Sequence, residues 1–389
     1  MGEVLALLNL MLSSILHVSE RFQSTYQIDK VEPMNHIDKI GLIGVAHPHS
    51  IAHLKTLRWI DQIVDIPIYD PDESAIRNAK EEIGDKIGEI YTDLDSLLNR
   101  TDVPIMFVCL RNDQTPDVLI KCADAAKHII VEKPVATSAE AFKPALDTIE
   151  KAGLKMTVCF QNRYHPMVQE IFNLIGEGIL GTPMSIEMRM ITSQVRFRDP
   201  DHWLFQKELS GGGILSWLGC HYLDMACYFM RDRVSEVSAI VATNSGESID
   251  VEDTASLSFR FSSGSVGSLH AGYMLPFSGS GYMGPSYDTY IAIRGTKGNI
   301  VWNPFEMEKP LTAESTIVAW ETSPHRVFHH QLPACDAYGG IHGVKFVTDF
   351  LDTIASEKQP AVSGNDMMHV LEILDAAYES DATGRRINI

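Results

Sequence analysis

The stretch that decides the fold is Ile40-Gly-Leu-Ile-Gly44-Val-Ala46-His47-Pro-His49, which leads into residues 50–60. An apolar run ends at a glycine, and residues 50–60 then carry apolar side chains near helical spacing. A strand, a glycine turn and a helix in this order form a dinucleotide-binding turn when the turn reads G-x-G-x-x-G. Gly44 stands at the first glycine position, but Ala46 and His49 occupy the second and third.

The alternation of strand and helix continues outward from this turn. Further strands are predicted at residues 64–69, 87–91, 104–110, 128–131 and 155–160, with helices at 72–83, 94–98, 116–126 and 138–152. Strands that alternate with helices through short loops predict a doubly wound parallel sheet with helices on both faces, the α/β class.

After about residue 165 the pattern changes. Longer stretches that alternate polar and apolar residues predict antiparallel strands, at residues 184–193, 236–243, 255–261, 265–271, 287–294 and 299–302. Helices are expected at residues 214–230, 342–356 and 365–382. The sequence therefore predicts a second, α+β domain with a mostly antiparallel open sheet.

Residues 1–36 are an extension of uncertain status. Their apolar run, residues 4–18, is short for a membrane span, and only Glu3 precedes it where a signal peptide would carry basic residues. We expect a dispensable extension or an upstream start. A secretory signal and a docking amphipathic helix stay open as alternatives.

Composition excludes several classes of partner. The 389 residues are 45% hydrophobic and 21% charged, with a formal net charge of −19, which is typical of a globular domain that repels nucleic acid and anionic membranes. The six cysteines form no CxxC pair, which indicates free thiols in a reducing, cytoplasmic compartment.

Asp70 follows the second predicted strand, 26 residues after Gly44. A carboxylate there can accept hydrogen bonds from a ribose 2′-hydroxyl, which favours NAD over NADP. The alternative is that Asp70 only caps its own turn. His47, His49 and His53 have a spacing that suits a metal, but no nearby cysteine or carboxylate completes a set, so we expect no metal and histidines that donate to a phosphate or pack in the turn.

Glu132-Lys133-Pro134 follows a predicted buried strand, at the edge where doubly wound sheets bind ligands. Partial burial lowers the pKa of a lysine at such an edge, so Lys133 is a candidate electrophile or proton donor. The alternative is a surface turn.

Gly211-Gly-Gly213 precedes a predicted helix that carries Trp217, His221 and Asp224. Three glycines allow close approach of the backbone, and His221 could act as general base for a hydroxyl group. The alternative is a core histidine bonded to Asp224, three residues further along the helix.

In order and spacing these motifs resemble the glucose–fructose oxidoreductase/inositol dehydrogenase (Gfo/Idh/MocA) family, from about Lys39 to the C-terminus. The Glu-Lys-Pro motif is the specific marker, supported by Gln161-Asn-Arg163-Tyr-His-Pro166, Gly178-Ile-Leu-Gly181 and the ending around Ala376 to Arg386. The resemblance implies a Rossmann domain, placed at residues 37–163, and a substrate and oligomerisation domain at 164–389. It also implies a homodimer or homotetramer.

The resemblance implies an NAD(P)-dependent oxidoreductase, most simply with NAD, acting at a carbinol carbon of a sugar, sugar derivative or cyclitol. By that analogy Lys133 polarises the reacting oxygen and His221 takes the hydroxyl proton. The cofactor-binding residues would be Gly44, Ala46, His47, His49, Asp70, Leu110, Arg111, Asn112, Glu132 and Lys133. The substrate would contact Lys133, Arg163, Tyr164, Trp203, Trp217 and His221.

Position 217 departs from the family pattern, which often has aspartate four residues before the histidine. Trp217 removes one expected carboxylate, which Asp224 could replace, and its ring could stack on a sugar. Two alternative functions therefore stay open. One is a redox-neutral lyase or glycosidase that acts through a transient keto-sugar, and the other is a cofactor-binding regulatory protein without turnover.

Overall fold

A computed structural model describes residues 37–277, 279, 286–304, 310–356 and 358–389. The predicted extension at residues 1–36 lies outside the described residues.

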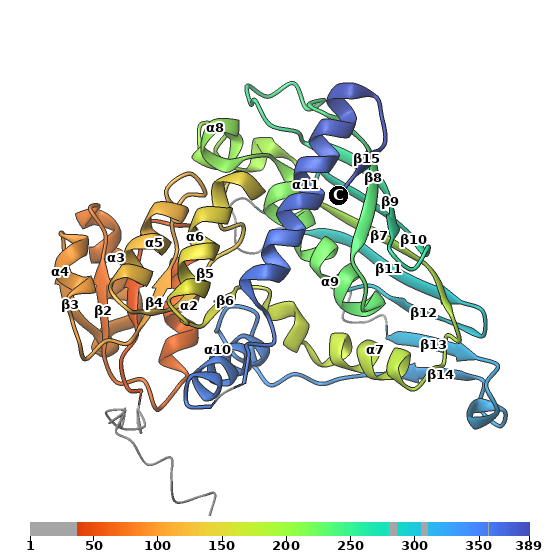
Figure 1. The fold of residues 1–389 in the computed structure, drawn as a ribbon, viewed down its shortest axis with the longest axis horizontal. Coiled ribbons are helices and arrows are strands. Elements are labelled where there is room, and N and C mark those ends of the chain that lie inside the picture. Colours follow the sequence, from red (N-terminus) through yellow and green to blue (C-terminus); the bar gives the residue numbers. More distant parts are fainter. Residues whose placement is uncertain (1–36, 278, 280–285, 305–309, 357) are drawn as a thin grey trace, which may run out of the picture. The chain divides into compact units, whose positions relative to one another are not determined.

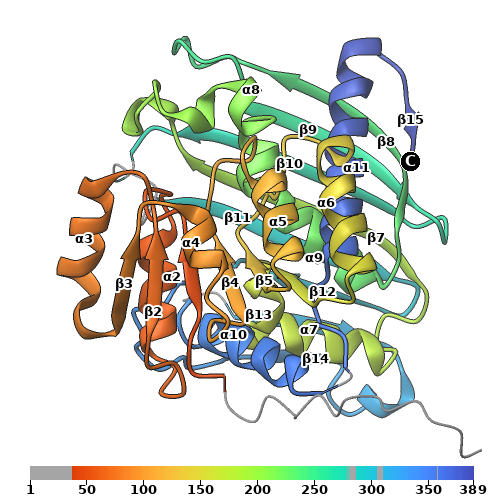
Figure 2. The same ribbon diagram turned by 60° about the vertical axis from the view of Figure 1, so that its left-hand side comes forward.

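The first sheet has six strands, in the order β3-β2-β1-β4-β5-β6, and every pairing in it is parallel (Figures 1 and 2). The strands are β1 (Gly41–Ile43), β2 (Ile66–Tyr69), β3 (Ile87–Tyr91), β4 (Ile105–Val108), β5 (His128–Val131) and β6 (Met156–Val158). This is the strand order of a doubly wound Rossmann sheet, whose direction of winding changes between β1 and β4. The predicted parallel sheet is confirmed.

Five helices connect these strands: α2 (Ser50–Arg58), α3 (Glu73–Ile83), α4 (Leu94–Leu98), α5 (Thr115–Asp124) and α6 (Ala139–Lys151). Side-chain caps fix where several of them begin. Asp72 accepts hydrogen bonds from the backbone of Ser74 and Ala75 at the start of α3, and Ser138 accepts one from Ala141 in α6.

The second sheet has nine strands, in the order β14-β13-β12-β11-β7-β10-β9-β8-β15. They are β7 (Pro183–Ser193), β8 (Val234–Ala242), β9 (Thr254–Phe261), β10 (Val266–Leu275), β11 (Tyr287–Gly295), β12 (Gly298–Trp302), β13 (Leu311–Ser315), β14 (His325–Phe328) and β15 (Ile387–Asn388). All pairings are antiparallel except β7 with β10, so the predicted mostly antiparallel sheet is confirmed.

The longer helices of this second region are α7 (Pro166–Gly176), α9 (Cys220–Met230), α10 (Ile341–Ile354) and α11 (Gly364–Thr383), and α8 (Lys207–Ser210) is a single turn. The helix predicted at residues 214–230 is not uniform, because Leu215–Gly219 is a π-helical turn that leads into α9. Helix α7 was not predicted. His165 caps it and Pro166 opens it, an arrangement that favours a helix start.

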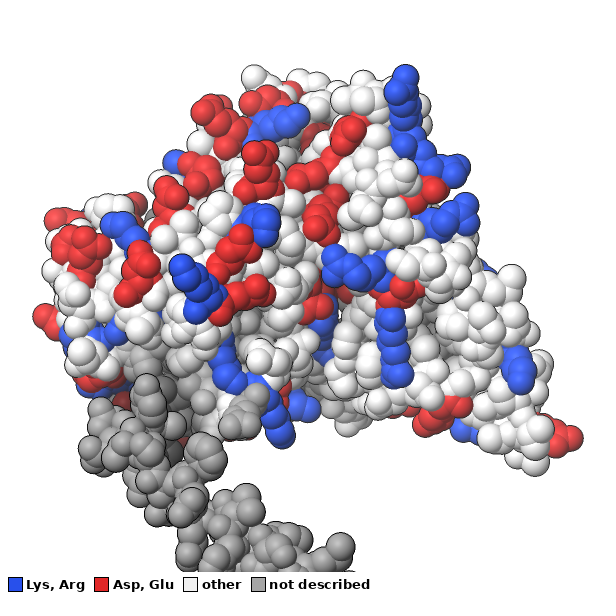
Figure 3. Space-filling view, viewed as in Figure 1, with Lys and Arg blue, Asp and Glu red and all other residues white. Residues whose placement is uncertain are grey.

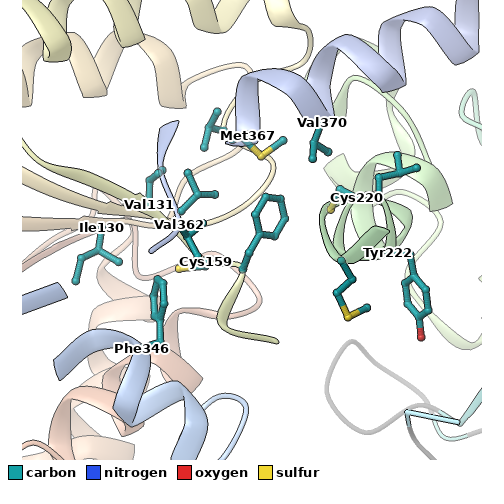
Figure 4. Close-up of a cluster of buried hydrophobic side chains, with 14 of the residues drawn as sticks. Ile130, Val131, Cys159, Cys220, Tyr222, Phe346, Val362, Met367 and Val370 are labelled. Carbon is teal, nitrogen blue, oxygen red and sulfur yellow. The ribbon is translucent and has the colours of Figure 1, made fainter. Parts of the chain in front are cut away.

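The last helix joins the two regions. Helix α11 contacts β8 and α9 of the second region and also α6 and β6 of the first. At the start of α6, the backbone N–H of Ala139 donates to the Asp375 carboxylate of α11, at 2.9 Å. Figure 4 shows part of the shared core, with Val131 of β5, Met367 of α11 and Phe346 of α10.

The glycine stretch before α9 is required by close packing. A Cβ atom on Gly213 would overlap the backbone carbonyl of Glu252. The Glu252 carboxylate accepts hydrogen bonds from the N–H groups of Gly213 and Leu215, at 2.8 and 2.9 Å, and so caps the π-helical turn. Tyr378 of α11 donates a further bond to the same carboxylate at 3.1 Å.

Acidic and basic side chains are interspersed on the face drawn in Figure 3. In the part of the chain that the structure describes, no helix has the length and apolar character needed to cross a bilayer.

Candidate active site

Five residues form one row across the first sheet, each directly after the end of a strand. In sheet order they are Asp70, Gly44, Cys109, Glu132 and Cys159, which follow β2, β1, β4, β5 and β6. The carboxyl edge of a doubly wound sheet is where ligands bind, next to the change in winding direction. The two predicted motifs around Gly44 and Glu132 therefore meet at this edge.

The turn after β1 depends on Gly44. Its φ of +90° lies in the region that favours glycine, and a Cβ atom would overlap the carbonyl oxygen of Cys109 and the side chain of Leu110. The predicted residue Leu110 therefore lines the turn. Ser50, the first residue of α2, donates its hydroxyl to the carbonyl of Gly44.

Asp70 holds this turn from the neighbouring strand. Its Oδ2 accepts a hydrogen bond from the backbone N–H of Ala46, and its Oδ1 accepts one from Asp72, both at 2.8 Å. The turn-capping alternative is thus present in the structure. It does not exclude a ribose contact, because each carboxylate oxygen can accept more than one hydrogen bond.

Glu132 is the centre of a buried network. The Nδ1 of His49 lies 3.1 Å from its Oε1, and the Nε2 of His53 lies 2.6 Å from its Oε2. Both imidazoles donate, because an ionised carboxylate can only accept. Burial raises the pKa of the Glu132 carboxyl, but the two histidines and Lys133 outweigh it and hold the pKa well below its usual value.

Lys133 is fully buried, and its Nζ makes one hydrogen bond, one ion pair and one contact with an aromatic ring. Its Nζ donates to the carbonyl of Trp217 at 2.8 Å, lies 3.6 Å from the Glu132 carboxylate and lies 3.8 Å from the centroid of the Trp217 ring. The alternative of a surface Glu-Lys-Pro turn is therefore wrong. The π-helical turn brings Trp217 onto the lysine that the motif singled out.

The expectation that no cysteine or carboxylate lies near the histidines of the turn is wrong. The fold brings Glu132 and Cys159, both buried, to His53, and their potential ligand atoms lie within 4.8 Å of one another. A carboxylate and a cysteine therefore do lie near the histidines. The carboxylate already accepts from two imidazoles and faces the ammonium group of Lys133, so this group is a closed ion network and we propose no metal in it.

His221 is buried near this network without the predicted carboxylate partner. Among the described residues its Nδ1 has no hydrogen-bond partner, and burial, with the charge of Lys133, holds its pKa well below the usual value. Asp224 instead pairs with Arg163 at 2.5 Å, and burial raises the pKa of Asp224 to about 6. The expectation that Asp224 could bond His221 is wrong, because the guanidinium group is the stronger partner.

Two predicted substrate residues have other partners. Arg163 is buried and bonds Asp224, Asp366 and the carbonyl of Ala361. Tyr164 donates to Asp349 at 2.5 Å. These bonds tie the segment before α7 to the C-terminal helices, so we no longer propose Arg163 and Tyr164 as substrate ligands.

The loop after β4 joins the two regions. Asn112 is buried and donates to the carbonyl of Ser210, at 2.7 Å, directly before the glycine stretch. Arg111 pairs with Asp113 at 2.8 Å and is partly exposed. Of the predicted cofactor residues in this loop, Asn112 is therefore bonded to the second region, and Arg111 is partly exposed.

Aromatic rings cover the Lys133 side of the turn. The His47 ring lies 5.7 Å from the ring of Trp203 and 5.8 Å from that of Trp217, and the two tryptophans meet edge to face at 6.3 Å. The structure thus brings the predicted substrate residues Trp203, Trp217 and Lys133 close to one another, with His47 beside them.

Sequence reasoning missed Tyr338, the pairing of His53 with Glu132, and Glu252. The Tyr338 hydroxyl lies 3.2 and 3.3 Å from the two nitrogens of His49, and its backbone N–H donates to Thr56 of α2. Tyr338 lies in a stretch without a helical or strand pattern. The one local signal beside it is the Gly-Gly pair that follows, which is typical of a turn.

The described residues fit a bound dinucleotide. A left-handed glycine opens the turn, Asp70 stands at the end of β2, and the turn lies at the carboxyl edge of the sheet. At the same edge His47 has a buried ring nitrogen, Nε2, without a partner among the described residues, which no contact of the turn itself explains.

Comparison with known proteins agrees with this architecture. Residues 39–160 match the model of the "Oxidoreductase family, NAD-binding Rossmann fold", and residues 168–301 match that of the "GFO/IDH/MocA C-terminal domain". The fold and site thus define an NAD-binding oxidoreductase. The chain belongs to the GFO/IDH/MocA family.

Several relatives match over nearly their whole length. The myo-inositol 2-dehydrogenase of Thermotoga maritima is 27% identical over 355 residues, which cover 90% of this chain and 98% of the relative. The levoglucosan dehydrogenase of Pseudarthrobacter phenanthrenivorans is 25% identical, over 88% of this chain and 94% of the relative. A solved structure of levoglucosan dehydrogenase in complex with NADH and levoglucosan has a TM-score of 0.77, at 25% identity over 90% of this chain and 99% of that one.

The buried histidines predict acid lability. Burial lowers the pKa of His49 and His165 to about 4 and that of His342 to about 3, from 6.5 in an unfolded chain. Between pH 6.5 and 4 the unfolded state binds more protons than the native state, so the free energy of unfolding falls as pH falls. Each such histidine contributes a slope of up to about 1.4 kcal/mol per pH unit.

Urea unfolding of the wild type and of His342→Phe, measured from pH 7 to pH 4.5, checks this prediction. The variant should lose one histidine's share of the slope. An unchanged slope would contradict the assignment of His342 as a neutral, buried imidazole.

Proposed function

We propose that this protein transfers hydride between NAD and a CH–OH carbon of a sugar, sugar derivative or cyclitol. The observation that carries the proposal is the contact between Lys133, at the edge of the dinucleotide-binding sheet, and the turn that leads into His221. Relatives named inositol and levoglucosan dehydrogenase support the substrate class.

Lys133 is the residue that polarises the reacting oxygen. The Glu132 carboxylate lies 3.6 Å from the Nζ of Lys133 and balances the charge of an ammonium group inside the protein. This Nζ donates to the carbonyl of Trp217, and its contact with the Trp217 ring involves no lone-pair acceptor. A substrate oxygen would take the place of that ring contact, because it offers the ammonium group a better acceptor.

His221 is the residue that accepts the hydroxyl proton. Its imidazole is neutral, because burial and the charge of Lys133 hold the pKa well below its usual value. A neutral imidazole can take a proton, and a protonated one cannot. The cofactor would be held by the turn from Gly44 to His49 together with Asp70, and when bound it supplies the hydride acceptor.

Asp70 supports a preference for NAD over NADP. Its buried carboxylate lies at the end of β2 and is bonded to the turn, so a ribose hydroxyl beside it can donate to an oxygen, whereas a 2′-phosphate would be repelled.

We further propose that residues 37–163 and 164–389 are separate domains and that the protein is cytoplasmic. The second domain would form a homodimer, or the dimers of a tetramer, through its open sheet face. Helices α9 and α11 lie on one side of the nine-stranded sheet in Figure 1. On the other side the strands expose small, polar and apolar residues, among them Ser258, Ile240 and Val266. Exposed strand faces of this kind are suited to self-association. The six free cysteines support a reducing compartment.

Turnover tests the proposed function directly. Wild-type protein should bind NADH in calorimetry. With added NAD⁺ it should oxidise a member of a panel of myo-inositol, levoglucosan and D-xylose, read as the absorbance of the NADH that forms. Lys133→Met should lower kcat/KM by about a hundredfold or more and leave the NADH Kd nearly unchanged, because it removes the polarising ammonium group but fills the same space.

The exposed Lys143→Met variant is the matched control and should behave as wild type. Binding of NADH without net reduction would favour the redox-neutral or the regulatory alternative. No binding of NAD(H) or NADP(H) would refute the proposal, and full turnover by Lys133→Met would remove this lysine from the mechanism.

Asp70→Asn tests cofactor choice. The amide keeps the shape and one acceptor oxygen but removes the charge that repels a 2′-phosphate. The ratio of NADPH Kd to NADH Kd, measured by calorimetry, should fall about tenfold. An equal loss for both cofactors would mean that Asp70 serves only the turn.

Light scattering tests the dimer. The wild type should show at least twice the chain mass, and Ile240→Lys combined with Ser258→Lys should shift it toward the monomer. Val318→Lys, at an exposed apolar residue outside the strands, is the control. A monomeric wild type would refute the proposed interface.

A further inference from the structure

His47 lies within the dinucleotide turn but faces the aromatic side chains of the second region. Its ring is tilted against the rings of Trp203 and Trp217, with centroids 5.7 and 5.8 Å away. Only 7% of the residue is exposed. Trp217 in turn covers Lys133, at 3.8 Å. Trp217 therefore contacts both His47 and Lys133, the lysine proposed to polarise the substrate.

The hydrogen bonds of His47 fix its tautomer. Its Nδ1 accepts the backbone N–H of His49, at 3.2 Å. Burial and the neighbouring His49 keep its pKa well below the usual value, so the ring is neutral and its single proton is on Nε2. This Nε2–H group is buried and has no acceptor among the described residues.

A buried N–H group without an acceptor costs free energy, which a ligand that supplies the acceptor recovers. The charge around the group describes that ligand. The charges of Lys133 and Glu132 cancel at 3.6 Å, and His49 is neutral, with a pKa lowered to about 4 by burial. The surroundings of the donor therefore favour a neutral acceptor oxygen over an anion such as a phosphate.

The rings beside the donor describe the rest of the ligand. Trp203 is partly exposed and offers an apolar aromatic face, which suits C–H groups, and the histidine offers one directed donor beside it. The ring of Trp217 is already in contact with Lys133 and His49. A pyranose presents both complements, because its ring has an apolar C–H face and carries oxygens around its rim. A phosphate presents only the oxygens.

We propose that the Nε2–H group of His47 binds an oxygen of a neutral pyranose whose C–H face lies against Trp203. This deepens the proposed function, on which it rests, by naming the sugar class and a binding residue. It also assigns His47 to the substrate, although the family resemblance had assigned it to the cofactor. One residue of the dinucleotide turn would thus bind the sugar.

Two substitutions separate the two nitrogens of His47. In His47→Asn the amide oxygen can replace Nδ1 and accept the N–H of residue 49, as an asparagine does two residues before a turn N–H, but no donor reaches the Nε2 position. In His47→Gln the amide N–H can reach the Nε2 position, while the bond to the turn is lost.

The measurement is tryptophan fluorescence of the NADH-loaded protein, titrated with levoglucosan and with methyl β-D-glucopyranoside, because Trp203 forms part of the proposed site. NADH affinity is measured separately by calorimetry. His47→Asn should weaken sugar binding by about fivefold, the worth of one neutral hydrogen bond, and change the NADH Kd less than twofold. His47→Gln should keep the sugar affinity within about twofold of wild type.

The exposed His325→Asn variant is the matched control and should not change either affinity. If both His47 variants weaken NADH binding and leave sugar binding unchanged, His47 belongs to the dinucleotide and the inference is wrong. It is equally wrong if the wild type binds NADH but neither pyranose. Absence of NADH binding would refute the proposed function itself, so the two failures are distinguishable.

Discussion

The buried carboxylate of Glu132 is the constraint on which the rest of the site depends. An ion removed from water is costly unless charges and hydrogen bonds compensate it, and here two imidazoles and one ammonium group do so. One of these imidazoles belongs to His49, which stands where a dinucleotide turn usually has its third glycine. The larger side chain is accommodated because it turns inward to the carboxylate. The Glu132 carboxylate thus does two things: it binds the histidine that replaces the third glycine, and it balances the charge of Lys133.

Much of the fold could be predicted from the sequence, because its main elements have strong periodic patterns. The parallel order around β1 and α2 and the change to antiparallel strands were both correct. The misses are helix α7, whose start is fixed by His165 and Pro166, and several short elements. Strands β13, β14 and β15 have two to five residues, too few for alternation to be recognised. The helical pattern before α9 hid a π-helical turn, because a π turn differs from an α-helix in hydrogen bonding and not in residue type.

The candidate site was predictable only where a motif carries it. Lys133 and Trp217 were identified from sequence, but their contact depends on how the π-helical turn is oriented, which no local pattern encodes. The spacing of His221 and Asp224 suggested a pair on one helical face. In the structure Arg163, 61 residues away in sequence, binds that carboxylate instead. Local spacing lists possible partners, whereas charge complementarity across the fold selects among them.

The bond from Ala139 of α6 to Asp375 of α11 has a consequence for biosynthesis. Helix α6 belongs to the region made first, yet the acceptor at its N-terminus is 236 residues further along the chain. Strand β15, almost the last segment, closes the edge of the nine-stranded sheet beside β8. During translation the first sheet is therefore synthesised before helix α11. Part of its surface stays uncovered until α11 has left the ribosome. Docking of α11 and β15 then covers this surface. A nascent chain that stops before these elements exposes a surface of the kind that chaperones and proteases recognise.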